Sequence, residues 1–526
     1  MSVHKENEKY SEGLEVVTLP ELSNDSNDVT PSSTSPPSSV HSFDVEKKVL
    51  EDPIDLEQVE LTLPAKLGIS SFTRWLYRAF FSFFRICITP INYSDCPFLD
   101  VAFSYYRKTF TVIFAANLLA FVVFVARNRG APSAESVGSA ASANLMVTLL
   151  FRQENFVNLI YELATDIIPL SAPLWLRRRL AKVFHYGGAH SGAGVAAVVW
   201  YIMYTALTTK DHIANPTKWS LANMVTSYIL VLMFCFILGG AHPSFRRKYH
   251  DYFEAVHRYS GWVAVCTFWM HQCFAGNQYR LLQSNPPSLG RYLISTSGFW
   301  TFIVSSSCTA LSWARLRRVD VYPETLSNHV TRLHFKYRNM KPFYGLKVSS
   351  KPLLEWHAFA TIPDEDANGK PDGFSIVVSN AGDWTNDVIQ NPPKKLWVRG
   401  YPLHGLLYTS KLFRKIVVVA TGSGIGPPLS LFYADFTPRR IFWSTPAPET
   451  TYGSKVIDMV KKADPDAWIW DTRKQGRPDM VAVTYKLVAE SGAEAVFIIS
   501  NPKLTRKVVY GMESRGIPAY GAIFDS

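Results

Sequence analysis

The chain has 526 residues, more than one compact core usually holds, so two or three units are expected. Mean hydropathy is near zero and the net charge is +11, but residues 1–70 are polar whereas residues 98–313 contain nearly all the long apolar runs. Because basic residues flank those runs, the charge fits a membrane protein, and no nucleic-acid partner is expected. The six cysteines form no CxxC or CxxCH motif, which argues against zinc, iron–sulfur clusters and covalently bound haem.

The N-terminal part is predicted to lie outside the membrane. Residues 24–40 are rich in Ser, Pro and Asp, so residues 1–70 are predicted to form a disordered cytosolic tail without a cleaved signal peptide. Residues 71–96 begin with an aromatic and basic stretch that carries Arg74, Arg78 and Arg85. That composition is typical of an amphipathic helix on the inner leaflet, and an extended first span is the alternative.

Residues 97–314 are predicted to form a six-helix transmembrane bundle. A span needs about 20 mostly apolar residues, and five stretches qualify: near 109–126, 191–208, 221–240, 259–275 and 292–313. A sixth, around 141–171, is interrupted by Arg152, Glu154 and Glu162, so it must face the bundle interior or be broken. Clusters of Arg and Lys beside alternate spans predict a multi-pass protein with both termini in the cytoplasm.

Four histidines lie in or beside these spans, where ionisable residues suggest function. His257 and His271 are 14 residues apart, which suits ligands of two stacked haems. The partner helix carries His185 and His190 only near its cytoplasmic end, so the outer site lacks an evident second ligand. The sequence therefore allows one haem b between His190, or His185, and His257; hydrogen bonding within the bundle is the alternative.

Beyond Arg318 the pattern changes to short strands. Residues 330–337, 345–350 and 373–380 alternate as in a small β-barrel. Apolar strands then follow at 416–420, 439–445 and 495–500, with helical stretches between them. This order predicts an antiparallel β-barrel FAD domain over residues 315–412 and an NAD(P)-binding α/β domain over residues 413–526.

The most informative motif runs from Ala420 to Pro427 (ATGSGIGP), directly after an apolar strand. Glycines at this place let the backbone approach a pyrophosphate, and the N-terminus of the following helix favours its negative charge. A glycine-rich turn alone is weak evidence, but the strand–turn–helix context predicts a dinucleotide site here.

Further motifs accompany the turn: His357-Ala358-Phe359, GDWT at 382–385, GRPD at 476–479 and the terminal IFDS at 523–526. With them the module resembles the ferredoxin–NADP reductase-type domain of the ferric reductase and NADPH oxidase superfamily. HYGGAHSG at 185–192 and HRYSGW at 257–262 add to the match. From about residue 70 onward the chain resembles the fungal TmpA-type integral membrane flavoproteins of that superfamily.

The resemblance implies FAD and NAD(P)H as cofactors, and it assigns roles to residues. His357 and Phe359 would contact the flavin, and Trp384 and Thr385 would lie near the FAD pyrophosphate. Phe524 would stack on the isoalloxazine, with packing of an aromatic residue as the alternative. The remaining assignments concern the nicotinamide dinucleotide, which would be held by Gly422, Gly424, Gly426, Pro427 and, at its ribose or phosphate, Arg477.

Three positions depart from the family pattern. Ala360 stands where the family has Ser or Thr near flavin N5, and Ser500-Asn501-Pro502 replaces Cys-Gly-Pro near the nicotinamide. Residues 444–446 offer no Arg for a 2′-phosphate, so NADH and NADPH both remain open. The first two of these departures lie at the expected hydride-transfer site.

The sequence as a whole predicts a membrane-bound FAD-dependent oxidoreductase, with flavin and nicotinamide carrying the chemistry. It would take hydride from NAD(P)H on the cytosolic face and pass electrons to an unidentified acceptor. The resemblance implies a role in redox homeostasis or developmental signalling. One alternative is a non-catalytic, nucleotide-sensing signalling protein. A ferric reductase is another, although electron export across about 30 Å of membrane needs more histidine ligands than are evident.

Overall fold

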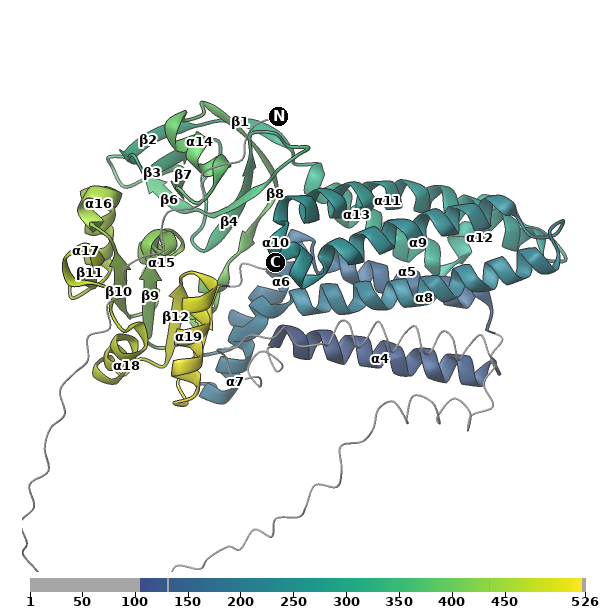
Figure 1. The fold of residues 1–526 in the computed structure, drawn as a ribbon, viewed down its shortest axis with the longest axis horizontal. Coiled ribbons are helices and arrows are strands. Elements are labelled where there is room, and N and C mark those ends of the chain that lie inside the picture. Colours follow the sequence, from purple (N-terminus) through teal and green to yellow (C-terminus); the bar gives the residue numbers. More distant parts are fainter. Residues whose placement is uncertain (1–104, 130–131, 435, 523–526) are drawn as a thin grey trace, which may run out of the picture. The chain divides into compact units, whose positions relative to one another are not determined.

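The computed structural model describes residues 105–129, 132–434 and 436–522, all within one unit, Pro64–Ser526 (Figure 1). The predicted disordered tail at 1–70, the predicted interfacial segment at 71–96 and Phe524 lie outside the described residues.

The described chain is helical up to Trp313 (Figure 1). Helix α8 packs against α4, α5 and α9, while α11 packs on α9 and α13 packs on α5. By length and composition, α4, α8 and α9 qualify as candidate membrane spans among the described residues. The helices are α4 (Tyr105–Arg127), α5 (Ala134–Leu150), α6 (Glu154–Thr165), α7 (Leu174–Leu180), η1 (Ala181–His185), α8 (Gly187–Ala214), α9 (Leu221–Ala241), α10 (Pro243–Lys248), α11 (His250–Leu281), α12 (Leu289–Ser295) and α13 (Ser297–Trp313).

The segment around 141–171 is broken, which was one of the two alternatives. Helix α5 ends at Leu150, and α6 begins at Glu154 after Gln153 has capped it by accepting from the backbone N–H of Phe156 (2.8 Å). The buried Glu154 accepts a hydrogen bond from Ser312 (2.6 Å), because a carboxylate removed from water needs such a partner. Helix α6 then contacts strand β8 (Lys395–His404).

The stretch near 292–313 is also divided, since α12 and α13 are separated by Thr296. Helix α11, by contrast, is longer than the expected 259–275 and begins at His250. The nine residues that α11 adds before Tyr259 include the charged Asp251, Glu254 and Arg258. A search for apolar runs therefore does not assign them to this helix.

Small residues let α8 approach α4 closely. A Cβ added at Gly188 would lie 2.2 Å from the carbonyl oxygen of Tyr106, and one at Gly192 would lie 2.9 Å from that of Phe110. The hydroxyls of Tyr106 and Ser191 also hydrogen-bond across this contact. The glycines of HYGGAHSG therefore serve the packing of two helices.

We expect Gly188→Ala to lower the free energy of unfolding by about 1–3 kcal/mol, because the atom that a new methyl group meets is backbone and cannot swing away. Gly239→Ala in α9 is the matched control, since nothing lies within 4 Å of an added Cβ there. Thermal unfolding of both variants in detergent measures the difference. Equal shifts for the two would contradict the close packing of α4 and α8.

Two four-stranded antiparallel sheets follow, with strand orders β1-β8-β4-β5 and β2-β3-β7-β6. The predicted barrel is thus two separately hydrogen-bonded sheets that share one core, in which Val348 and Val398 of one sheet join Leu333 and Phe374 of the other. The alternating pattern arises because every second residue points into that core. The strands are β1 (Arg317–Asp320), β2 (Tyr322–Ser327), β3 (Val330–Phe335), β4 (Tyr344–Ser349), β5 (His357–Ala360), β6 (Ile362–Glu365), β7 (Pro371–Ser379) and β8, and α14 (Asp383–Gln390) lies between β7 and β8.

A five-stranded parallel sheet ends the described chain, with strand order β11-β10-β9-β12-β13 (Figure 1). Both faces are covered, since α15 and α16 share one apolar core with the sheet and α18 and α19 share another. Burial on both faces explains why these strands are apolar without alternation. The elements are η2 (Leu406–Leu412), β9 (Ile416–Thr421), η3 (Gly422–Ile425), α15 (Gly426–Ala434), β10 (Arg439–Thr445), α16 (Pro448–Ala463), β11 (Trp468–Asp471), α17 (Thr472–Gln475), α18 (Met480–Ser491), β12 (Ala495–Ile499), α19 (Pro502–Glu513) and β13 (Ala519–Gly521).

Helix α7 joins the helical part to the parallel sheet through Arg177. This side chain is 3% exposed and donates to both carboxylate oxygens of Glu494, at 2.8 and 3.1 Å. It also donates to the carbonyl oxygens of Leu412 (2.6 Å) and Ala172 (2.8 Å). Arg177 belongs to the basic run 177–179, one of the clusters beside the predicted spans, and it is therefore engaged within the protein.

Candidate functional site

The glycine turn lies where the strand order of the parallel sheet reverses. Strand β9 has β10 on one side and β12 on the other, and η3 with α15 follows directly from its carboxyl end. In open parallel sheets, ligands bind outside the carboxyl ends of the strands at such a reversal. Topology and motif therefore indicate the same place for a dinucleotide.

Close packing holds the turn in place. A Cβ added at Gly424 would lie 2.2 Å from the carbonyl oxygen of Ile499, at the end of β12. Trp443 donates from its indole N–H to the carbonyl oxygen of Gly422 (3.0 Å). The turn is therefore fixed in position by protein contacts, and preorganisation of this kind lowers the entropy cost of binding.

A hydroxyl pair beside the turn was not expected. Thr421 is the last residue of β9 and Ser500 directly follows the neighbouring strand β12, and their hydroxyl oxygens are 2.5 Å apart. The sequence signal was present, because each follows directly on an apolar strand. The Tyr452 hydroxyl is also near the turn, 3.8 Å from an added Cβ at Gly422, and burial raises the pKa of Tyr452 to about 12, so this group stays neutral.

We expect Gly424→Ala to lower the free energy of unfolding by about 1–3 kcal/mol, because the methyl group would collide with the backbone of β12. Gly426→Ala is the matched control two residues on, where an added Cβ meets nothing within 4 Å. Denaturant unfolding without added nucleotide separates the variants. A Gly424→Ala protein as stable as Gly426→Ala would refute the tight contact with Ile499.

The residues expected at the flavin form a second cluster. The ring of His357, on β5, stacks on Trp384 at the start of α14, with centroids 4.0 Å apart and planes 20° apart. Phe359 lies against the same indole at 5.9 Å, and Trp384 donates to the Ser350 hydroxyl (3.0 Å). Of the four predicted FAD-contacting residues that the structure describes, three thus share one aromatic cluster.

Thr385, the fourth, is engaged locally. Its hydroxyl accepts from the backbone N–H groups of Ala381 (2.8 Å) and Gly382 (2.9 Å) and donates to the Gly382 carbonyl oxygen. It therefore shapes the turn that positions Trp384. The buried Nε2 of His357 has no hydrogen-bond partner among the described residues, and a carboxylate oxygen of Glu355 is 3.6 Å away. A ligand could therefore supply a hydrogen bond to this nitrogen.

The helix that follows the glycine turn connects the two clusters. Helix α15 contacts β5, which carries His357 and Phe359, and also β6. Ser430 of α15 accepts from the backbone N–H of Phe343 (2.7 Å), and Tyr433 donates to Glu365 (2.5 Å). The turn and the flavin cluster are thus tied to one shared helix. An aromatic cluster with an unpaired imidazole nitrogen fits the binding of FAD, and a rigid glycine turn fits that of a dinucleotide.

Two other predicted residues lie at the edges of this arrangement. Pro427 is in the first turn of α15, and Arg477 is exposed in the loop between α17 and α18, beyond the edge strand β11. Trp470 donates to the carbonyl oxygen of Gly476 (2.9 Å), and Asp479 caps α18. Much of the GRPD motif therefore shapes the loop that presents Arg477.

Among the membrane histidines, His190 donates from Nδ1 to the Thr148 carbonyl oxygen (2.8 Å), which leaves Nε2 as the acceptor nitrogen of its ring. His185 lies elsewhere, packed against Phe184 and Tyr105 at ring distances of 4.2 and 6.1 Å. Within the described chain no group of three or more His, Cys, Asp or Glu side chains is arranged for a metal ion.

The outer histidine, His271, is packed among aromatic rings. Its Nδ1 lies 3.0 Å from the Thr226 hydroxyl oxygen, and the ring centres of Tyr204 and Tyr201 are 5.3 and 5.9 Å away. Phe268 closes a further side at 6.2 Å. Among the described residues, the surroundings of His271 thus offer edge-on aromatic rings and a hydroxyl, and no second imidazole.

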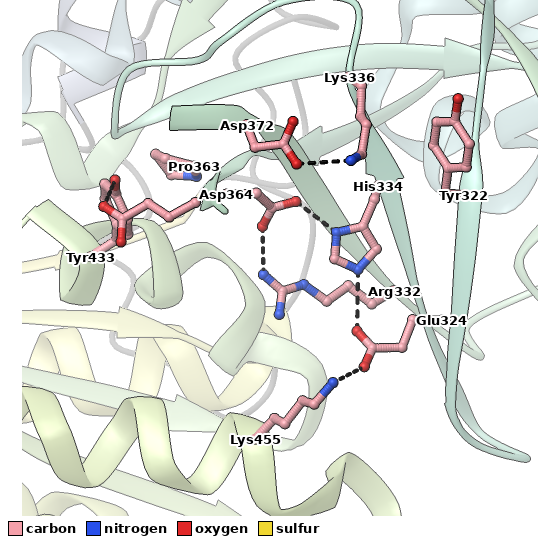
Figure 2. Close-up of a pocket in the computed structure, with 11 residues that line it drawn as sticks. Tyr322, Glu324, Arg332, His334, Lys336, Pro363, Asp364, Asp372, Tyr433 and Lys455 are labelled. Atoms are coloured by element: carbon pink, nitrogen blue, oxygen red, sulfur yellow. Dashed lines mark hydrogen bonds and ion pairs between the residues drawn. The ribbon is translucent and has the colours of Figure 1, made fainter. Parts of the chain in front are cut away.

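A cavity of about 580 Å³ lies away from every predicted site residue. Figure 2 shows its ionic network, in which His334 bridges Asp364 (2.7 Å) and Glu324 (3.2 Å). Arg332 pairs with Asp364 (2.8 Å), and Lys455 of α16 pairs with Glu324 (2.5 Å). Its charges pair with one another and tie the sheet to α16. We therefore assign it a structural role.

Comparison with known proteins gives one family match and two strong relatives. Residues 406–526 match the model described as adenylate-forming reductase 03009, C-terminal domain. Adenylate-forming reductases 03009 and 06235 of Coprinopsis cinerea are 43% and 42% identical over 424 and 427 residues, covering 81% of this chain and 40% of each relative. The relatives of this chain are fungal reductases. The chain spans about 40% of their length, and membership of the TmpA-type branch stays a prediction.

Solved structures resemble the chain only distantly. A ferredoxin–NADP+ reductase from Neisseria gonorrhoeae with bound FAD and NADP is 12% identical, covering 40% of this chain and 98% of that one, with a TM-score of 0.33. A flavohemoglobin from Malassezia yamatoensis with bound FAD and heme is 12% identical, covering 73% and 98%, with a TM-score of 0.35.

Proposed function

We propose that this chain is a membrane-bound, FAD-dependent oxidoreductase that takes hydride from NAD(P)H on the cytosolic face. The observation that carries the proposal is the link between the glycine turn at the strand-order reversal and the His357–Trp384 cluster through α15. The reductase names of the relatives support the same class of activity. The acceptor is unidentified, and redox homeostasis or developmental signalling is the proposed setting.

Different residues of the chain would bind FAD and the nicotinamide dinucleotide. FAD, when bound, supplies the hydride-accepting chemistry. His357 would meet a polar group of the flavin through its unpaired Nε2, while Phe359 and Trp384 would offer aromatic faces. The backbone from Gly422 to Pro427 and the N-terminus of α15 would hold the dinucleotide phosphates, with Arg477 contributing from the edge.

We further propose that residues 97–314 form the membrane domain, followed by an FAD domain at 315–412 and a nucleotide domain at 413–526. Helices α5, α11 and α13 would join the candidate spans α4, α8 and α9 to make six. Both termini would then lie on the cytosolic side. The packing of α8 against α4, α5 and α9 supports a bundle with α8 at its centre.

One haem b between His190 and His257 is the proposed additional cofactor. The hydrogen bond from His190 Nδ1 to the Thr148 carbonyl oxygen fixes the tautomer in which Nε2 carries no proton, so Nε2 could hold the iron. His257→Ala should abolish a Soret band that His271→Ala retains. The aromatic packing of His271 gives no support for a second haem, so we do not propose electron export to extracellular iron.

Absorbance of the detergent-purified protein tests the central proposal. A flavin spectrum that bleaches on addition of NADH or NADPH is the expected result, and the faster nucleotide identifies the donor. Purified protein without flavin, after supplementation with FAD, would sink the proposal.

A nucleotide-sensing protein without turnover is the second candidate. The Ser500 hydroxyl, which stands where the family has a thiol, is bonded to Thr421. Ala360 offers no hydroxyl near flavin N5. Tight nucleotide binding with a flavin that stays oxidised would favour this candidate.

A further inference from the structure

The turn between β4 and β5 exposes two neighbouring leucines. Leu353 is 58% exposed and Leu354 is 59% exposed. The turn is well formed, because the backbone N–H groups of Leu354 and Glu355 both donate to the carbonyl oxygen of Lys351, at 2.9 and 3.1 Å. Two large aliphatic side chains at the tip of an ordered turn indicate an interaction surface.

The other side of this turn already has its partners. Trp356 is buried, packs on Trp313 with ring centres 6.2 Å apart, and carries the Arg399 guanidinium 4.5 Å from its ring centre. The leucines therefore cannot turn inward without displacing this stack. Their apolar surface therefore faces away from this stack.

Hydrogen bonds from helix α11 fix the position of this turn along the helix axis. The Tyr259 hydroxyl donates to the carbonyl oxygen of Leu353 (3.3 Å), and the Arg258 guanidinium donates to the carbonyl oxygens of both leucines. Arg258 is itself oriented by Glu254 at 3.0 Å. The two leucines thus lie beside Arg258 and Tyr259 of α11.

From Tyr259 onward, α11 carries an exposed stripe of apolar side chains. Tyr259, Val263, Met270 and Phe274 recur at helical spacing and are 37–55% exposed, whereas charged residues precede Tyr259. The helix from Tyr259 to Leu281 is about 33 Å long at 1.5 Å per residue, close to the ~30 Å of a bilayer core. An exposed tyrosine at this level is typical of a membrane boundary.

We propose that Leu353 and Leu354 insert into the inner leaflet and contact lipid acyl chains, with the exposed Lys351 among the headgroups. The inference rests on the membrane placement proposed above. His357 follows three residues after Leu354, so this lipid contact would hold the flavin-binding strand at a fixed height above the membrane.

Site-specific photo-crosslinking in nanodiscs of phosphatidylcholine and phosphatidylserine tests this contact. The photo-reactive residue p-benzoylphenylalanine replaces Leu354 in the full chain, an exposed position where folding is not at risk. Met270 (55% exposed) on the stripe is the positive control, and Tyr485 (47% exposed) on α18 is the negative control. Mass spectrometry identifies the adducts.

Lipid adducts at Leu354 and Met270, and none at Tyr485, are expected. Adducts at Met270 alone would overturn the insertion of the turn while leaving the membrane placement intact. A crosslink from Leu354 to protein, either to residues 1–104 of the same chain or to a second copy, would overturn it too. Absence of adducts at Met270 would overturn both inferences, whereas flavin bleaching by NAD(P)H tests the oxidoreductase independently.

Discussion

Replacing Arg177 with Met should lower the free energy of unfolding by about 3 kcal/mol. This is the lower end of the ~3–5 kcal/mol for breaking a buried ion pair, because Glu494 keeps 19% of its side chain exposed. The variant also leaves the buried carbonyl oxygen of Leu412 without its donor. Thermal or denaturant unfolding in detergent measures the loss.

Lys395→Met is the matched control. It removes an ion pair to Asp320 whose partners are 55% and 65% exposed, so its cost should stay under about 1 kcal/mol. Comparable losses for the two variants would show that burial of Arg177 adds nothing.

The same pair predicts a pH dependence. The hydrogen bond from Arg177 lowers the pKa of Glu494 below its ordinary value of 4.5, against the opposing effect of burial. A depressed carboxyl pKa stabilises the fold above the unfolded value and loses that contribution as the pH falls through the folded value. The stability gap between wild type and Glu494→Gln should therefore be full at pH 7 and shrink below about pH 4.5. A gap that is unchanged in acid would contradict the assigned ion pair.

Replacing His357 with Ala should weaken FAD binding by about 10–100-fold, since it removes both a stacked ring and the proposed hydrogen bond to the flavin. That factor corresponds to about 1.4–2.8 kcal/mol. Fluorescence titration of flavin-depleted protein with FAD measures it. His334→Ala is the matched control, because that histidine lies in the ionic network of the same β domain and away from the aromatic cluster. Equal weakening in both variants would point to general destabilisation.

Several elements could be anticipated because their cause is local. The antiparallel strands follow from alternation, and the parallel strands follow from short apolar runs with a glycine turn after the first of them. The break near Glu154 is one of the two alternatives that the sequence leaves open, because Arg152, Glu154 and Glu162 interrupt the apolar segment.

Other features depend on residues far apart in the chain, which periodicity cannot reveal. Arg177 counted as a basic residue beside a span, but its partner lies 317 positions away. The Thr421–Ser500 pair required knowing that β9 and β12 are neighbours. Likewise, the choice of His190 over His185 as the partner of His257 depends on how η1 turns before α8 begins.

The 317-residue separation of Arg177 and Glu494 has a consequence for synthesis. At roughly 5–20 residues per second, about 15–60 s pass between the emergence of the two. Throughout that time the guanidinium has no carboxylate to meet, and water must solvate it beside the first helices. The helical part must therefore insert while the surface around Arg177 is still uncovered. That surface is covered only when β12 has joined the sheet. Chaperones or proteases that recognise incomplete chains have that interval in which to act.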